Sequence, residues 1–482
     1  MGSPPGIAAA GPMIADMLGT QRTVPAARNA PVRLEPLAGL GDRRPIDVVE
    51  AFRDLPGLAV LESARPGRNG RWSYLTADPV TVLEAPARGA DPFAEARRLL
   101  TRLAPDEALG GPPFAGGLVG YLSYDLGRRF ERMPSIARDE QPLPLLRLAL
   151  HDWLIAWDRR SGEAWLGGRA VEGDVRRLAR RLDDVRERLV APRPLPPEPS
   201  VGPFVFRSGL DRPAFERGVE TIRDAIARGE IYQANLTRRL ETPFDRDPWP
   251  LFRHLRTGDP ALFAAFLDLG GGRALLSASP EPFLSADASG RVTTDPIKGT
   301  RPRGRTREED RALARELLAS AKDRAENVMI VDVLRNDLGR VCVPGSVTVP
   351  RLLRLERTAA VQHLVTTVAG RLAPGRDAFD LLAASFPGGS ITGAPKIRAM
   401  QILERLEPVR RGPYTGALGW IGPDGAMATS ILIRTFVADG TRLTLHVGGG
   451  ITWGSEPAAE WDETVAKARG PLEAVGGREV GS

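Results

Sequence analysis

A proline-rich segment in the middle of the chain constrains the fold more than any other feature of the sequence. Between Ala191 and Pro203, six of 13 residues are proline. Proline fixes φ and lacks an amide hydrogen, so such a run favours an extended spacer over a helix or a central strand. The chain of 482 residues is also too long for one ordinary hydrophobic core. We therefore predict a linker at residues 191–203 between two folded regions, residues 34–190 and 204–474.

The two ends of the chain are predicted to be tails. The first 33 residues are rich in glycine, alanine and proline, and the first basic residue is Arg22. A secretory signal carries its positive charge before an apolar run, whereas Asp16 interrupts that run here. We expect residues 1–33 to be a disordered N-terminal tail and residues 475–482 a C-terminal tail. No run of 18 apolar residues occurs, so the sequence predicts no membrane span.

The composition excludes several classes of protein. Hydrophobic residues make up 42% of the chain and charged residues 26%, as in a globular protein. The net charge is only +6, and no basic run contains interleaved aromatic residues, so we expect no nucleic-acid partner. The single cysteine, Cys342, excludes an internal disulfide and a CxxC zinc site. One cysteine also fits a reducing compartment, and we expect a cytoplasmic protein.

Hydrophobic periodicity predicts both helices and strands, separated by glycine and proline turns. The predicted helices span residues 173–190, 212–229 and 307–335. The predicted strands span residues 148–157, with a hairpin partner at 161–167, and residues 415–421, 427–436 and 442–447. Meandering strands with separated helices favour an α+β fold over a regular βαβ fold.

Lysine is rare in this chain, and its rarity singles out a candidate nucleophile. Only four of the 66 basic residues are lysines: Lys298, Lys322, Lys396 and Lys467. Arginine stays charged, whereas a desolvated lysine can lose its proton and attack carbon. Lys298 lies in the segment Asp-Pro-Ile-Lys-Gly-Thr, between a strand and a loop, and we take it as the candidate for the chemistry. The alternative is a solvated surface lysine.

Two pairs of acidic residues suggest a metal site. Asp323 and Glu326 are three residues apart, as are Glu460 and Glu463, so each pair can share one helix face. Clustered carboxylates without histidine or cysteine suit Mg²⁺. Taken alone, such a pair is more often a solvated face. Lys467, four residues beyond Glu463, either forms a salt bridge with it or binds a substrate carboxylate.

Glycines and histidines mark further candidate site segments. Three glycines, Gly448 to Gly450, follow a predicted strand and would let an anionic ligand approach the bare backbone. His446 is predicted to be a core residue, whereas a core role and a site role are equally open for His363.

Together these segments resemble the chorismate-utilising enzymes, which include anthranilate, aminodeoxychorismate, isochorismate and salicylate synthases. The most specific motifs lie between residues 231 and 468. They are Ile231-Tyr-Gln-Ala-Asn-Leu, Ser279-Pro-Glu, Pro296-Ile-Lys-Gly-Thr, Glu326-Asn-Val-Met-Ile-Val-Asp, Arg335-Asn-Asp-Leu-Gly-Arg, Pro387-Gly-Gly-Ser-Ile-Thr-Gly-Ala-Pro-Lys and Glu460-Trp-Asp-Glu. Less specific motifs, Phe114-Ala-Gly-Gly-Leu-Val-Gly-Tyr and Tyr124-Asp-Leu-Gly-Arg, extend the resemblance into the first half. It implies a two-lobed antiparallel β-sandwich core with helices on the outside.

Two positions of the family's pattern distinguish its reactions. Members that add water have a lysine base where this chain has Gln233, and anthranilate synthases typically have alanine where this chain has Lys298. The combination found here resembles aminodeoxychorismate synthases. It implies that Lys298 attacks C2 of chorismate and that ammonia then enters at C4, giving 4-amino-4-deoxychorismate. Glu281 matches the general acid, although Pro282 replaces an arginine of many relatives, which puts the pose of Glu281 in question.

The resemblance also implies a cofactor, partners and further site residues. Mg²⁺ would be held by Glu326 and Glu463, with Asp323 and Glu460 beside them, and His363 would lie near the substrate ring. Ammonia would come from a separate glutamine amidotransferase subunit, and Ser63 would border a candidate effector pocket with Glu62 and Arg71-Trp-Ser. The implied substrate-binding residues are Gly299, Thr300, Ser390, Tyr414, Arg434, Gly448, Gly449, Gly450 and Lys467.

Two alternatives stay open at this stage. One is an anthranilate synthase component I, which aminates chorismate at C2. The other is an arginine-rich anion-binding protein without catalysis. The sequence leaves open whether the product enters folate synthesis, through 4-aminobenzoate, or an antibiotic pathway.

Overall fold

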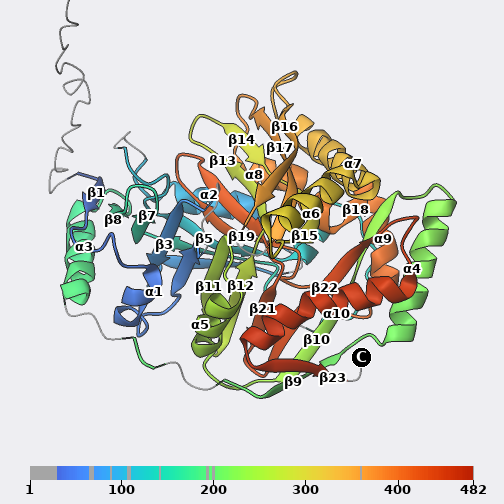
Figure 1. Cartoon of the computed structure of the whole chain (residues 1–482). Helices are drawn as coiled ribbons and strands as arrows, with labels where there is room; N and C mark the ends of the chain where they lie inside the picture. Colours follow the sequence, from blue (N-terminus) through green and yellow to red (C-terminus); the bar gives the residue numbers. More distant parts are fainter. Residues whose placement is uncertain are drawn as a thin grey trace, which may run out of the picture.

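The computed structural model describes residues 30–64, 70–86, 89–105, 110–140, 143–190, 195–197, 201–358 and 361–480. Two large sheets form the centre of the molecule, and the longer helices lie on the outside (Figure 1). The observed architecture confirms the α+β fold predicted from the sequence. Within the described ranges, the strands pair antiparallel except β23 with β9.

The first sheet has 13 strands. In spatial order it contains β1 (Val32–Pro36), β8 (Glu163–Arg169), β7 (Trp153–Asp158), β3 (Trp72–Thr76), β2 (Ala59–Glu62), β11 (Phe263–Gly270), β12 (Arg273–Ser279), β21 (Thr435–Asp439), β22 (Arg442–Ile451), β10 (Gln233–Pro243), β9 (Phe204–Ser208) and β23 (Gly477–Val480), with β18 (Gly393–Ala394) beside β10.

The second sheet has ten strands and packs against the first. In spatial order it contains β15 (Ile297–Pro302), β17 (Val361–Arg371), β14 (Arg291–Thr294), β13 (Pro282–Ala286), β20 (Met427–Ile431), β19 (Ala417–Ile421), β5 (Gly117–Leu122), β6 (Leu146–His151) and β4 (Thr81–Ala85), with β16 (Thr348–Arg357) also paired with β17.

Helices cover the outer faces of the two sheets (Figure 1). They are α1 (Pro45–Val48), α2 (Pro92–Leu100), α3 (Val175–Val190), α4 (Arg212–Ala227), α5 (Trp249–Gly258), α6 (Arg307–Ala319), α7 (Ala321–Gly339), α8 (Ala378–Ser385), α9 (Lys396–Leu406) and α10 (Pro457–Ala474). Short 3₁₀ helices η1, η2 and η3 span Val49–Ala51, Tyr124–Arg129 and Gly389–Ile391. In the described part of the chain, no helix is long and apolar enough to span a membrane.

Both sheets combine strands from before and after the proline-rich segment. In the first sheet β2 pairs with β11, so that Val60 lies opposite Phe266. In the second sheet β5 pairs with β19, so that Gly120 lies opposite Gly419. The hydrophobic core between the sheets is therefore built by both predicted regions. Of the predicted linker at 191–203, only residues 195–197 and 201–203 are described.

Two segments predicted as single strands are each divided between the sheets. The predicted strand at 148–157 is broken at Asp152 into β6 of the second sheet and β7 of the first. The predicted strand at 427–436 is divided in the same way into β20 and β21, and Arg434 between them has φ +50°. Both halves of each segment are largely buried, which explains why each segment is predicted as one strand. The hairpin partner predicted at 161–167 is confirmed as β8, which pairs with β7.

Two further predictions differ from the structure. The helix predicted at 307–335 is two helices, because Ser320 has extended ψ and its hydroxyl accepts the amide of Asp323 at 3.2 Å, which caps α7. Residues 477–480 of the predicted C-terminal tail form β23 beside β9, where Glu479 accepts from the fully buried Arg238 at 3.1 Å. At the other end, β1 begins at Val32, inside the predicted tail, and residues 1–29 lie outside the described ranges.

Candidate active site

A cavity of about 620 Å³ brings together most of the residues that the sequence singled out. Its walls are formed by β15, β17, β22, α7, α10 and η3, and its size is in the range of small-molecule sites. The predicted site residues that line it are Glu281, Lys298, Gly299, Thr300, Asp323, Glu326, His363, Ser390, Tyr414, Arg434, Gly448, Gly450, Glu463 and Lys467.

Lys298 extends from β15 into this cavity. Its Nζ donates a hydrogen bond to the carbonyl oxygen of Ser390 in η3, at 3.0 Å. Burial lowers the pKa of the Lys298 amine, and the nearby carboxylates of Glu281 and Glu326 oppose this shift without cancelling it. The neutral amine is therefore more accessible here than on the surface.

Glu281 lies between β12 and β13, on the same cavity as Lys298. Glu281 is 8% exposed, and burial raises the pKa of its carboxyl, which favours the protonated form. Pro282 is the first residue of β13 and pairs with Ser430, a strand position that tolerates proline. The backbone beside Glu281 is fixed because its carbonyl accepts the amide of Ile431 at 3.0 Å.

Three carboxylates from two helices are within electrostatic reach of one another; we name them the carboxylate cluster. They are Glu326 on α7 and Glu460 and Glu463 on α10. Burial raises the pKa of Glu326 and of Glu460, and a neighbouring carboxylate adds to each shift. Oε1 of Glu326 is buried and has no hydrogen-bond partner among the residues that the structure describes. Burial opposes the charge of Glu463, but Lys467 at 2.6 Å holds the pKa of that carboxyl below its ordinary value.

The four predicted metal ligands do not form a finished coordination shell. In the described ranges, no three or more histidine, cysteine, aspartate or glutamate side chains are close enough together to hold a metal ion. Asp323 is held instead by Arg301, at 3.2 Å. Glu460 is 5% exposed and lies behind Gly449, where an added Cβ would come within 3.2 Å of its Oε2.

The glycines near the site are required by close contacts. Gly299 has φ +77°, and a Cβ there would lie 2.9 Å from Leu317 and 3.0 Å from Asp323. β15 can thus approach the start of α7 only with glycine at this position. Gly448, Gly449 and Gly450 continue β22 and pair with β10, so the sheet uses part of their backbone hydrogen bonding. Their missing side chains leave room beside Lys467, which donates to the carbonyl of Gly448 at 2.9 Å.

Polar and aromatic groups complete the wall of the cavity. Thr300 Oγ1 and His363 Nδ1 are 2.9 Å apart. His446, predicted to be a core residue, is 3% exposed but also lines the cavity, and it stacks on Tyr414 with 5.0 Å between ring centroids. Burial lowers the pKa of His446 well below its ordinary value, so the imidazole is neutral. Arg434 forms an ion pair with Asp259 at 3.3 Å.

Sequence reasoning gave no role to several further lining residues, of which Asn235, Lys322 and Arg301 are polar. Asn235 could have been predicted from the sequence. It follows Gln233 by two positions in the motif Ile231-Tyr-Gln-Ala-Asn-Leu, so the two residues lie on the same face of a strand. Lys322 was noted as a rare lysine but given no role. Arg301 had no signal in the sequence, since arginine is abundant in this chain.

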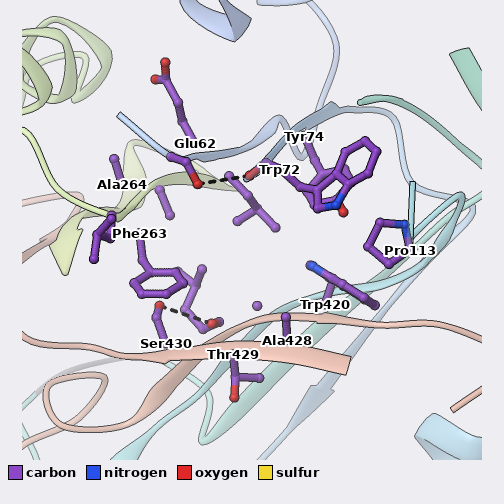
Figure 2. Close-up of a pocket in the computed structure, with 16 residues that line it drawn as sticks. Glu62, Trp72, Tyr74, Pro113, Phe263, Ala264, Trp420, Ala428, Thr429 and Ser430 are labelled. Atoms are coloured by element: carbon purple, nitrogen blue, oxygen red, sulfur yellow. Dashed lines mark hydrogen bonds between the residues drawn. The ribbon is translucent and has the colours of Figure 1, made fainter. Parts of the chain in front are cut away.

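Ser63 lies away from this cavity, at a second one of about 170 Å³ between the sheets (Figure 2). The lining is mostly apolar and includes Trp72, Phe263 and Trp420. The Ser63 hydroxyl donates to the carbonyl of Trp72 at 3.1 Å. Ser63 also lines a neighbouring cavity of about 470 Å³ whose walls include Ser73, Asp158 and Arg256, and it stays a predicted effector-pocket residue.

Comparison with known proteins identifies the family. The model of the chorismate binding enzyme family matches residues 60–473, so the chain belongs to this family of enzymes. It is 42% identical over 450 residues to anthranilate synthase component 1 of Streptomyces coelicolor, covering 89% of this chain and 86% of the relative. It is also 42% identical over 355 residues to aminodeoxychorismate synthase component 1 of Escherichia coli, covering 74% and 76%.

A solved structure supports the same assignment. Anthranilate synthase component I from Streptococcus pneumoniae superposes with a TM-score of 0.76 at 31% identity, covering 84% of this chain and 93% of that chain. The match confirms the predicted fold of the chorismate-utilising enzymes. Because the relatives bear two names at equal identity, the position of amination has to be argued from the site itself.

Proposed function

We propose that this chain aminates chorismate at C4 to 4-amino-4-deoxychorismate, with Mg²⁺ and with ammonia from a separate subunit. The observation that carries the proposal is the pairing of Lys298 with Glu281 in one cavity. Burial lowers the pKa of the amine and raises that of the carboxyl, so both groups are shifted toward the neutral forms that a nucleophile and an acid need.

The chemistry follows from these two groups. As the nitrogen of Lys298 forms a bond to C2, the ring double bonds shift and the C4–O bond breaks. The departing hydroxyl takes the proton of Glu281 and leaves as water. Ammonia then bonds to C4, the double bonds return, and the C2–N bond to Lys298 breaks. One difficult displacement is thereby divided into two easier ones.

Gln233 supports ammonia rather than water as the entering nucleophile. Its side chain is fully buried, and its amide nitrogen and oxygen have no hydrogen-bond partner in the described part of the chain. An added Cβ on Gly450, which lines the cavity, would lie 2.5 Å from the Gln233 amide nitrogen, so this amide is just behind the cavity wall. An amide cannot take a proton from water as a lysine base could.

The carboxylate cluster has the chemistry of a Mg²⁺ site, since it offers oxygen ligands, including one buried carboxylate oxygen that no described residue pairs with. Glu326 and Glu463 would hold the ion, with Glu460 behind Gly449 and Asp323 at the side. When bound, Mg²⁺ would supply positive charge for a substrate carboxylate. Lys467 and Arg434, two of the cations of the cavity wall, would take the remaining anionic charge.

Ammonia is proposed to come from a partner subunit. The relatives are named component 1, which implies another component. The chain's one cysteine, Cys342, is buried, and burial raises its thiol pKa, the opposite of what a glutaminase nucleophile needs.

The product from chorismate, ammonium and Mg²⁺ tests the proposal. We expect the mass and the NMR spectrum of 4-amino-4-deoxychorismate. Anthranilate would show C2 amination and overturn the proposed regiochemistry. Anion binding without any product would indicate the non-catalytic alternative.

A further inference from the structure

Arg411 is a buried arginine behind the wall of the cavity that holds Lys298, and the proposed reaction gives it no task. It lies between α9 and β19 and is 1% exposed. Its Nε and Nη2 donate to the carboxylate of Glu407, at 2.8 and 2.7 Å. Nη1 donates to the hydroxyl of Thr415 at 3.3 Å, and the guanidinium carbon lies 4.6 Å from the ring centre of Tyr124. These contacts explain how the charge is kept in the interior.

The two remaining N–H groups of Arg411 reach backbone carbonyls in two different parts of the cavity wall. Nη1 donates to the carbonyl of Ile391 in η3 at 2.9 Å, and Nη2 donates to the carbonyl of Asn235 in β10 at 2.6 Å. Ile391 and Asn235 both line the cavity, whereas Arg411 lies behind it. The planar guanidinium therefore holds the two wall segments at a fixed separation, with all of its N–H groups engaged.

The segment η3 depends on support from outside. It spans three residues, and the hydrogen bond that closes it, from the amide of Thr392 to the carbonyl of Gly389, is 3.4 Å long. The amide of Asn235 donates to the carbonyl of Thr392 at 2.9 Å, directly beside the contact with Arg411. The position of η3 relative to β10 is thus set by the guanidinium and by one backbone hydrogen bond.

We propose that Arg411 is a positioning residue, which fixes the η3 carbonyl that orients the amine of Lys298 toward the substrate. This inference rests on the proposed nucleophilic role of Lys298. The carbonyl of Ser390, one residue before Ile391, accepts from the Lys298 amine at 3.0 Å. A neutral amine has two N–H groups and one lone pair, so a fixed acceptor for one N–H restricts rotation about the Cε–Nζ bond. A shift of η3 would turn the lone pair away from C2 of chorismate and slow the attack.

Arg411→Lys separates the charge of the guanidinium from its geometry. The ammonium can pair with Glu407, but it is a single donor atom and cannot also bridge the two carbonyls. With the full chain, chorismate, Mg²⁺ and ammonium, we expect kcat to fall about 10- to 100-fold, while the KM for chorismate stays within about threefold. When chorismate is added without ammonium, the rate at which it labels the Lys298 peptide should fall by the same factor.

Arg238→Lys is the matched control, because Arg238 is also a buried arginine with a carboxylate and an aromatic ring as partners. It donates to Glu479 at 3.1 Å and lies 4.3 Å from the ring centre of Trp461. It is on the face of β10 opposite to Asn235 and is not part of the cavity wall. Both lysine variants should lower the urea midpoint, but Arg238→Lys should keep kcat within about threefold of the wild type.

A neutral double variant tests the same role if Arg411→Lys does not fold. Arg411→Gln combined with Glu407→Gln removes both charges, so no buried ion is left unpaired. The glutamine side chain is shorter than arginine and lacks the planar fork that spans the two carbonyls. The double variant should therefore show the same loss in kcat and in the rate of Lys298 labelling.

Two results would contradict the role of Arg411 while leaving the proposed reaction intact. One is labelling of Lys298 at the wild-type rate in both Arg411 variants. The other is an equal loss of kcat in Arg238→Lys, which would show that any loss of stability slows the reaction. A wild type that gains no chorismate label on Lys298 would instead overturn the nucleophilic role, and the positioning role with it.

Discussion

The pairing of Lys298 with Glu281 is the feature on which the chemistry depends at the residue scale. Lys298→Arg keeps a positive charge but removes the nucleophile, so it should lose C4 amination almost as fully as Lys298→Ala, by at least about a thousandfold. An electrostatic clamp would instead be rescued by arginine. The measurements are the amination rate and the mass of the Lys298 peptide after chorismate is added without ammonia. Near-normal amination by the Arg variant would exclude a covalent intermediate on Lys298.

The same pair predicts a pH dependence. Lys298 must be neutral, so activity falls as the pH drops through its lowered pKa; Glu281 must be protonated, so activity falls as the pH rises through its raised pKa. The kcat/KM profile of the wild type should have two limbs that belong to the coupled pair. Glu281→Gln should be about 10²- to 10⁴-fold slower and should keep only the rise with pH. Two unchanged limbs in this variant would exclude Glu281 as the acid.

The sequence alone identified these site residues, but it did not predict which other residues contact them. Lysine is so rare here that Lys298 and Lys467 stood out, and the acidic pairs were visible from their helical spacing. The contact of Arg301 with Asp323 was not predictable, because it joins residues 22 positions apart through one arginine among many. His446 was assigned to the core because a buried wall of a cavity and a core have the same apolar pattern.

At the scale of elements, the sequence predicted which segments are strands better than it predicted where they end. The segments 148–157 and 427–436 are each rich in apolar residues on both sides of the point where the chain crosses between the sheets, which is Asp152 in the first and lies near Arg434 in the second. The division of one strand between two sheets depends on tertiary packing, which local hydrophobic periodicity does not reveal. The division of 307–335 at Ser320 could have been anticipated, because Ser320 precedes Asp323 with the spacing of a helix cap.

The contact of β15 with α7 gives a prediction at this scale. Gly299→Ala adds strain at φ +77° and also forces a Cβ against Leu317 and Asp323, so β15 must move and carry Lys298 with it. We expect a loss of about 1–3 kcal/mol of stability and at least about tenfold in kcat. Gly345→Ala has the same backbone strain, at φ +79°, with nothing within 4 Å of its Cβ, and should keep its activity. Equal kcat values for the two variants would contradict the role of this contact.

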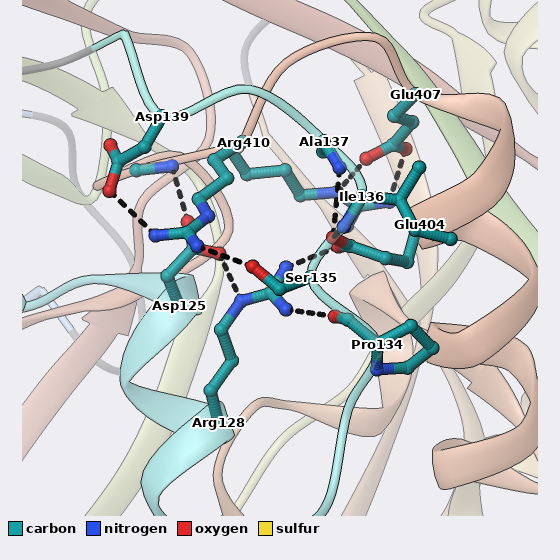
Figure 3. A network of polar contacts seen from close by, with 12 residues as sticks. Asp125, Arg128, Pro134, Ser135, Ile136, Ala137, Asp139, Glu404, Glu407 and Arg410 are labelled. Atoms are coloured by element: carbon teal, nitrogen blue, oxygen red, sulfur yellow. Dashed lines mark hydrogen bonds and ion pairs between the residues drawn. The ribbon is translucent and has the colours of Figure 1, made fainter. Parts of the chain in front are cut away.

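At the scale of the whole molecule, a polar network binds the residues before the proline-rich segment to those after it (Figure 3). Glu404 on α9 is 7% exposed and accepts the amides of Ile136 and Ala137, at 2.8 and 3.0 Å. It also pairs with Arg128, which reaches Asp125 at 2.9 Å. The segment after η2 is thus fixed to α9 by one buried carboxylate.

Glu404→Gln should therefore destabilise the protein as a whole. It leaves the guanidinium of Arg128 with one carboxylate fewer in a largely buried setting, at a cost of about 2–4 kcal/mol. Because each sheet joins strands of both regions, through β2 with β11 and β5 with β19, we expect the variant, like the wild type, to unfold in urea as one transition at a lower midpoint. Glu95→Gln, which breaks the exposed pair with Arg98, is the control and should leave the midpoint unchanged. Tryptophan fluorescence and far-UV circular dichroism should give coincident curves. Two separate transitions would show that the regions before and after residues 191–203 fold independently, despite the sheets they share.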